Sequence, residues 1–471
     1  MAVQTELWRA GARQLAELIR TRQVSSREVV EAHLARIAAV NDAVNAVTVV
    51  LAEQARAAAD AADAAVAAGA PLGPLHGVPM TVKENIDLAG TPTTQGIAAL
   101  AQAVPPGDAP HIAHLKAAGV IPIGRTNLPD FGLRWHTDNG LRGATRNPWD
   151  PRRTPGGSSG GEAAALATGM TPLGMGNDYG GSLRVPSQFC GTATIKPTTG
   201  RVPWVSLLEP RDFPITFQLF AVQGPMARRV EDLRVALAVM SRPDPRDPTW
   251  VPAPLEGPAP ARPVRVAVTV DPGGQGVDPD VAAGVRRAAA TLRDAGYRVE
   301  EVEPPAVATA GELWAKLVMT ELQMVLMPML EPVVSADARQ FLHLAARAMP
   351  PLSYGDYMAG FTARSGLARA WSEFQAEWPL VLGPVCTMPP FPVGYDLEGV
   401  EQVLALVRSM RLVVAGNLLG LPAAVVPVGV ANGLPQAVQI IGPRFREDLC
   451  LDAAQAIEER LGVLTPIDPR S

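Results

Sequence analysis

The sequence predicts a layered α/β fold. Segments with the apolar spacing of amphipathic helices alternate along the chain with short apolar runs bounded by turn residues, and this alternation is typical of helices packed on a sheet. A length of 471 residues and a hydrophobic share of 47% also allow one large buried core, or two to three smaller ones.

The first half of the chain alternates in this way from residue 25 onwards. A Ser-x-x-Glu capping box, Ser25 and Glu28, opens a helix predicted over residues 25–41. The elements that follow are a short strand with an alanine-rich helix, a buried strand between turns, and two helix–strand pairs, over residues 45–69, 75–90, 110–128 and 162–178.

The second half begins with a proline-rich segment. Residues 241–263 contain eight prolines and no periodic pattern, which predicts a stiff surface crossing, either a linker or a long connection within one domain. A strand is predicted over 264–270, and an amphipathic helix with a strand over 280–305. Residues 412–431 are long enough to span a membrane, but Asn417, Pro422 and Pro427 interrupt them, so a buried helix end followed by a buried strand is predicted.

Composition excludes several classes of function. The net charge of -5 gives no basic surface for nucleic acid. The N-terminus lacks the apolar run and cleavage site of a signal peptide. Three distant cysteines without a C-x-x-C pair indicate a reducing compartment, with neither a disulfide framework nor a zinc cluster. We therefore expect a cytoplasmic protein with no membrane or nucleic-acid partner.

The stretch TPGGSSGG, residues 154–161, is rich in glycine and serine and has three interpretations. A phosphate-binding loop is disfavoured because no lysine follows it. A nucleophile elbow is formally satisfied by Gly157, Ser159 and Gly161, but a loop precedes it where a strand is needed. The elbow also needs a later histidine, and beyond residue 136 there is only His343.

The third interpretation uses a second glycine-serine site in residues 174–186. Gly180 and Gly181 directly precede Ser182, so free backbone N–H groups could form an oxyanion hole beside a serine nucleophile. Lysine is scarce in this chain and Lys83 lies in an apolar strand, where burial disfavours its charge. Serving as a base near neutral pH requires its pKa to fall by roughly three units, about 4 kcal/mol. Ser158 or Ser159 could relay the proton, although glycine-serine turns and strand lysines are also common in purely structural roles.

Several blocks of the sequence resemble the amidase signature family. They are GVPMTVKENIDLAGTPTTQG, TRNPWDPRRTPGGSSGGEAAALATG, GNDYGGSLRVPSQFCG and KPTTGRVP, and the likeness is densest between residues 75 and 240. The resemblance implies a single domain over 1–471 with a large mixed β-sheet covered by helices on both faces. It also implies a variable, substrate-covering region at about 305–400.

The resemblance implies a role for each matched residue. Ser182 would be the acyl-forming nucleophile, Ser158 the cis-peptide serine that relays the proton, and Lys83 the base. The backbone N–H groups of Tyr179, Gly180, Gly181 and Ser182 would form the oxyanion hole. No metal or cofactor is implied.

Other matched positions are expected to support this machinery. Asp178 and Arg184 would pair to brace the nucleophile turn, and Ser159 would hydrogen-bond within its loop. Cys190 is expected to be a small buried residue, and Lys196 a structural contact.

Three features bear on the substrate. Tyr179 stands where many family members carry Thr or Ile, and it either lines the acyl pocket or packs beneath it. Trp135 and His136 either lie near the site or belong to the core. The methionines of residues 317–334 predict either a roomy apolar pocket or a helical core.

The predicted function is hydrolysis of amide-type C–N bonds in small aryl or alkyl amides, or in carbamates, through an acyl-enzyme on Ser182. The first alternative is a glutaminase component of a tRNA-dependent amidotransferase, from which residues 213–226 depart in sequence. The second is a catalytically idle binding protein. A homodimer is left open.

Overall fold

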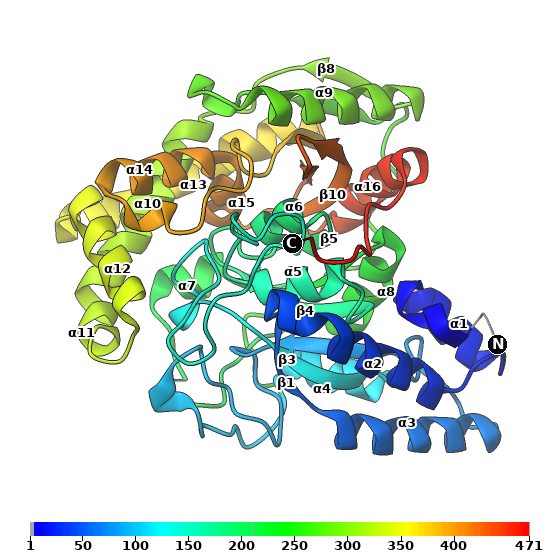
Figure 1. Ribbon diagram of the computed structural model, residues 1–471. Helices are drawn as coiled ribbons and strands as arrows, with labels where there is room; N and C mark the ends of the chain where they lie inside the picture. Colours follow the sequence, from blue (N-terminus) through cyan, green and yellow to red (C-terminus); the bar gives the residue numbers. More distant parts are fainter. Residues whose placement is uncertain (1–3, 210, 471) are drawn as a thin grey trace.

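A mixed sheet lies at the centre of the computed structural model, which describes residues 4–209 and 211–470 (Figure 1). The described residues form an 11-stranded sheet in the order β1-β3-β2-β4-β6-β5-β10-β11-β9-β7-β8. The strands are β1 Val47–Val50, β2 Pro79–Lys83, β3 Ile121–Thr126, β4 Leu173–Asp178, β5 Ala193–Lys196, β6 Val222–Ala227, β7 Arg265–Val268, β8 Arg298–Glu301, β9 Leu380–Pro384, β10 Ala423–Ala431 and β11 Leu434–Ile441.

Helices connect these strands and cover the sheet. They are α1 Ala12–Arg20, α2 Ser26–Val44, α3 Ala52–Ala67, α4 Pro110–Ala117, α5 Gly160–Ala167, α6 Arg184–Cys190, α7 Ile215–Phe220, α8 Val230–Met240, α9 Pro279–Asp294, α10 Val307–Glu321, α11 Met327–Leu330, α12 Ala336–Ala348, α13 Tyr354–Glu377, α14 Val400–Ser409, α15 Arg411–Leu419 and α16 Glu447–Leu461.

Strand direction changes across the sheet. The trios β3-β2-β4 and β9-β7-β8 are parallel, whereas the strands between them pair antiparallel. The hairpin β10–β11 lies between β5 and β9, so a late part of the chain joins the two parallel trios into one sheet.

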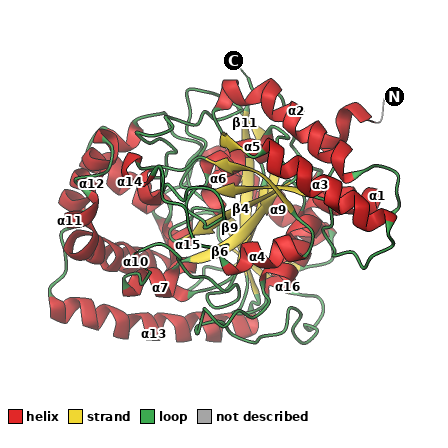
Figure 2. Cartoon of the chain, turned by 90° about the horizontal axis from the view of Figure 1, so that it is seen from below, coloured by secondary structure: helices red, strands yellow, loops and turns green. Residues whose placement is uncertain are grey.

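The sheet is buried between two layers of helices, and Figure 2 shows the strands enclosed in this way. Apolar side chains of α1, α4, α8, α9 and α16 form one core with one face of the sheet. Those of α6, α10 and α15 form a second core with other strand residues. Helices α2, α3 and α5 pack with β1 and β3 in a third cluster. The predicted mixed sheet with helices on both faces is confirmed.

A group of helices, α10 to α14, stands out from this body at the left of Figure 1. Within it, the helical stretch Val307–Leu330 contains an 18-residue window with a mean hydropathy of 1.3, so by length and composition it is enough to cross a membrane. Half of its most apolar window is buried inside the protein, and a π-helical turn, Leu322–Leu326, interrupts it. Core helices of soluble proteins share these properties.

The local predictions hold closely. The capping box at Ser25 and Glu28 is present and α2 follows it. The proline-rich residues 241–263 are mostly exposed and connect α8 to β7. Residues 412–431 form α15 and β10, as predicted.

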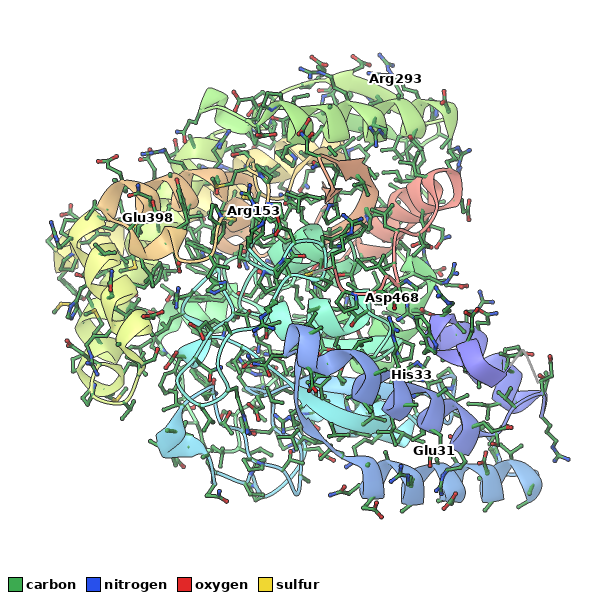
Figure 3. The ribbon with its side chains drawn as sticks, in the orientation of Figure 1. Glu31, His33, Arg153, Arg293, Glu398 and Asp468 are labelled. Carbon is green, nitrogen blue, oxygen red and sulfur yellow. The ribbon has the colours of Figure 1, made fainter. Side chains whose placement is uncertain are left out.

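The C-terminal segment packs back onto α2. Asp468, labelled in Figure 3, accepts a hydrogen bond from Arg36 of α2 at 2.7 Å.

Candidate active site

The candidate site lies where two neighbouring parallel strands end. Lys83 is the last residue of β2 and Asp178 the last of β4, and the two strands pair in parallel. The carboxyl ends of parallel strands therefore bring Lys83 and the turn 179–182 to the same edge of the sheet, which is the usual location of ligand sites in α/β folds.

Side chains along β2 point alternately to the two faces of the sheet, which places its polar side chains on one face. Met80 and Val82 enter a hydrophobic cluster, whereas Thr81 and Lys83 point the other way, toward α5. There Thr81 donates to the buried carboxylate of Glu162, and burial raises the pKa of Glu162 to about 7. A strand of five buried residues thus holds two polar groups in defined positions.

Lys83 is fully buried and has two oxygen partners. Its Nζ lies 2.7 Å from Ser158 Oγ and 2.7 Å from Asn177 Oδ1. Burial lowers the pKa of Lys83 to about 7, while the nearby Asp178 and Glu162 oppose the shift. An amine with this pKa is partly neutral at physiological pH and can accept a proton from the hydroxyl that it contacts.

The loop before α5 presents Ser158 to Lys83. The Gly157–Ser158 peptide bond is cis, as the resemblance implies. Gly157 packs so tightly that a Cβ there would lie 2.4 Å from the carbonyl oxygen of Arg134, so the position requires glycine. Ser159, expected to bond within its own loop, instead bonds across the site. Its N–H donates to the carbonyl of Ser182 at 3.3 Å, and its Oγ lies 3.5 Å from the carbonyl oxygen of Asn177.

The turn after β4 carries Ser182 at the N-terminal side of α6. Among the described residues, the backbone N–H groups of Tyr179, Gly180 and Ser182 have no protein acceptor, whereas that of Gly181 donates to Asp178 Oδ1 at 2.8 Å. Three of the four predicted oxyanion donors are thus free, and the fourth braces the turn.

Asp178 and Arg184 pair as expected. Arg184 Nε lies 3.0 Å from Asp178 Oδ2, and both side chains are fully buried. Burial opposes the charge of Asp178, but Arg184 outweighs it and holds the pKa of this carboxyl below its usual range. Arg184 also donates to the carbonyl of Val413, to Asn417 and to Gln439, which ties the turn 179–182 to α15 and β11.

Ser158 and Ser182 open into one cavity of about 840 Å³. Trp135 lines it and donates from Nε1 to the carbonyl of Gly180 at 2.9 Å. Tyr179 also lines it, so this ring belongs to the pocket wall. His136 is not among the lining residues. It is buried, its Nδ1 lies 3.0 Å from Thr154 Oγ1, and burial lowers its pKa to about 4.

The methionines of residues 317–334 likewise fall into two groups, one that lines the cavity and one that does not. Met319 and Met329 line the cavity, whereas Met324 and Met327 lie outside it. Cys190 is buried and donates to the carbonyl of Pro155, and Lys196 donates to the carbonyls of Pro197 and Leu421, as structural roles predict.

Sequence reasoning missed several residues of this site. Asn177, the second partner of Lys83, was not singled out, although it lies within the helix–strand pair predicted over residues 162–178. Trp314 and Glu321 line the cavity from α10 and carry no motif, so no sequence signal identified them. Asn417 was noted only as a break in an apolar run, because its partner Arg184 lies more than two hundred residues earlier in the chain.

The fold and the site define an amide-bond hydrolase, and comparisons with known proteins agree. The family model Amidase matches residues 28–451. Indoleacetamide hydrolase of Bradyrhizobium diazoefficiens is 45% identical over 97% of this chain and 88% of its own. One component of the glutamyl-tRNA(Gln) amidotransferase of Salinispora arenicola is 34% identical over 98% of this chain and 99% of its own. A solved bacterial aryl acylamidase of the amidase signature family is 27% identical with a TM-score of 0.82, over 96% of each chain.

The chain therefore belongs to the amidase family, and the resemblance seen in its motifs is confirmed. Its activity is the hydrolysis of an amide C–N bond.

Proposed function

We propose that the protein hydrolyses neutral aryl or arylalkyl amides, and the related carbamates, with Ser182 as nucleophile, Ser158 as proton relay and Lys83 as base. The observation that carries the proposal is the 2.7 Å contact between Lys83 Nζ and Ser158 Oγ, beside the cavity that Ser158 and Ser182 both line.

The mechanism follows from these positions. Ser182 Oγ attacks the amide carbonyl carbon, and its proton passes through Ser158 to neutral Lys83. The negative oxygen that forms faces the free N–H groups of Tyr179, Gly180 and Ser182. The C–N bond then breaks, and the leaving nitrogen takes the proton back through Ser158. Water, deprotonated by the same relay, releases the acid from Ser182. By the same steps a carbamate would release its amine and leave an alkoxycarbonyl group on Ser182. Water would release this group as a carbonic acid half-ester, which loses CO₂ to give the alcohol.

The cavity wall supports an apolar substrate. Trp204, Phe213 and Phe217 form a continuous aromatic group along the wall, with ring centroids 4.8 to 5.4 Å apart. Tyr179 extends the group, 4.8 Å from Phe217. Flat aromatic surfaces of this kind bind aryl groups by burial and offset stacking. The name of the indoleacetamide-hydrolysing relative, an arylalkyl amide hydrolase, is consistent with such a substrate.

The charges of the wall argue against glutamine. A glutaminase must hold the α-carboxylate of glutamine, which needs a free cation. Among the described residues, Arg134 is the only Lys or Arg that lines the cavity, and its guanidinium already forms two hydrogen bonds to Asp396, at 2.8 and 3.0 Å. Three carboxylates that form no ion pair with a described residue line the cavity as well: Asp87, Asp212 and Glu321.

The test begins with a serine-reactive sulfonyl fluoride on the wild type and on Ser182→Ala, followed by intact mass and peptide mapping. We expect one adduct, on Ser182, that the substitution abolishes. Indoleacetamide, phenylacetamide, anilides, aryl carbamates and glutamine are then assayed with the purified chain, without a partner or ATP. Turnover of glutamine alone would contradict the proposal, and the absence of any adduct would favour an idle binding protein.

We also propose a cytoplasmic location. The three cysteines, Cys190, Cys386 and Cys450, are all free thiols buried at separate places in the fold, which suits a reducing compartment.

A further inference from the structure

Glu321, near the end of α10, is a buried carboxylate whose partners are all uncharged. It is 7% exposed and accepts hydrogen bonds from the backbone N–H of Thr216 at 2.9 Å, from the hydroxyl of Thr216 and from the hydroxyl of Tyr357. Among the described residues, no Lys, Arg or His forms an ion pair with it. Three donors satisfy a buried carboxylate well enough to keep it in place.

The hydrogen bonds continue to the nucleophile turn in a defined direction. Because the Thr216 hydroxyl hydrogen is used on Glu321, the hydroxyl of Tyr179 must donate to Thr216 Oγ1, 2.7 Å away. Burial raises the pKa of both Tyr179 and Tyr357 well above the usual range, and Glu321 adds to the shift, so both phenols stay protonated and remain donors.

Tyr179 is the first residue after β4, and its own N–H is one of the three free donors beside Ser182. Its ring is held between Phe217, 4.8 Å away, and Trp314, 5.9 Å away, while its hydroxyl is held by Thr216. Fixing both the ring and the hydroxyl of Tyr179 fixes the backbone that precedes the nucleophile.

We propose that Glu321 is a positioning residue: through Thr216 it holds Tyr179, and with it the oxyanion-binding N–H groups beside Ser182, in the orientation that the reaction needs. Through Tyr357 the same carboxylate connects this turn to α13, so that three helices outside the motif blocks, α7, α10 and α13, set the geometry of the nucleophile turn. The inference rests on the proposed role of Ser182.

The experiment is a double-mutant cycle with two readouts. Glu321→Gln keeps the size of the side chain but replaces one acceptor oxygen with an NH₂ group, and Tyr179→Phe removes only the hydroxyl. Each single variant and the double variant are measured for kcat and KM on the best amide. They are also measured for the rate at which phenylmethanesulfonyl fluoride modifies Ser182, which requires no amide turnover. Glu312→Gln, an exposed carboxylate on the same helix, is the matched control.

We expect each single substitution to lower both kcat and the inactivation rate by about ten- to a hundredfold, with KM within about twofold. The double variant should lose no more than the more severe single variant, because both act on one chain of contacts. Independent, multiplying losses would overturn the proposal, as would an unchanged kcat. A rise in KM with unchanged inactivation would overturn it too, by assigning Glu321 to substrate binding.

A variant that fails to fold, or a wrong substrate class, can be told apart from a failure of the proposed role of Glu321. If Glu321→Gln does not fold, Thr216→Val replaces it in the same cycle, with the same expectation. If the wild type turns over no amide in the panel yet is modified at Ser182, the proposed substrate class fails, while the inactivation rates still decide the role of Glu321.

Discussion

At the residue scale, the buried amine of Lys83 sets the expected pH dependence. Since burial lowers its pKa to about 7, the neutral base should predominate above that pH and its protonated form below. We expect kcat/KM to rise with pH through a midpoint near 7 and then to level off, as measured in a pH–rate profile of the free enzyme.

Lys196 provides the matched control. Burial also lowers its pKa to about 7, but its amine contacts only backbone carbonyls. Lys196→Met should leave the midpoint in place, whereas Lys83→Met should abolish activity at every pH. A midpoint that disappears in the Lys196 variant would show that the wrong lysine had been chosen.

Gly180 allows a second prediction at this scale. A Cβ there would lie 2.6 Å from two ring carbons of Trp314, so Gly180→Ala must displace either the turn or the indole. We expect a loss of about 1–3 kcal/mol in the free energy of unfolding, typical of overpacking, and a clear fall in kcat. Adding Trp314→Phe removes the clashing carbons and should restore part of both. Wild-type kcat and stability in Gly180→Ala would contradict this packing.

Single site residues could be predicted from the sequence where a residue type is unusual among its sequence neighbours. Lys83 is a rare lysine in an apolar strand, and Ser182 follows two glycines, so both could be chosen from the sequence. Their roles stay predictions until the labelling experiment. Glu321 looks like any helical carboxylate in the sequence, because what distinguishes it is the set of uncharged partners that only the folded chain assembles.

At the scale of elements, the turn between β4 and α6 depends on the buried pair Asp178 and Arg184. Asp178→Asn would leave the guanidinium without its counter-charge, and we expect a loss of about 3–5 kcal/mol in the free energy of unfolding. Urea unfolding measures it. Asp452→Asn, which breaks an exposed pair with Arg234, should cost less than about 1 kcal/mol. Equal losses in the two variants would argue against a special bracing role.

The elements themselves were largely predictable because their signals are local. A capping box marks the start of α2, glycines end several helices, and apolar runs between turns mark β2 and β4. Residues 305–400, which contain α10 to α13, were predicted as a variable covering region, with an apolar pocket or a helical core at 317–334. Their mixture of apolar and polar faces does not reveal which face meets the cavity, since that depends on packing against α15 and α7.

At the scale of the whole molecule, the acidic wall of the cavity predicts charge selectivity. A neutral arylacetamide should be turned over with a kcat/KM at least about tenfold higher than the same compound carrying a carboxylate on its ring. The negative charge of that carboxylate would meet the carboxylates of the wall that form no ion pair, in a low-dielectric cavity. A panel of matched substrates measures the ratio. Asp212→Asn should reduce it, and a ratio near one in the wild type would remove the electrostatic argument against glutamine.

The overall architecture was predictable only in class. Alternating helices and strands indicated a layered sheet, and the motif blocks indicated the family, but neither gave the strand order, because pairing between β5 and β10 joins residues far apart in the chain. The single-domain prediction stays a prediction. The sheet shared by β1 and β8 supports it.

The place of the β10–β11 hairpin has a consequence for synthesis on the ribosome. Ser182 and Asp178 emerge early, but the partners that hold Arg184, among them Asn417 and Gln439, are translated more than two hundred residues later. A nascent chain released before β11 would carry Lys83, Ser158 and Ser182, but Arg184 would lack the partners that hold the turn 179–182 in place. We therefore expect ribosome-bound chains to be inert toward serine-reactive probes until the last strand of the sheet has been made, so that the cell meets the reactive serine only in a finished enzyme.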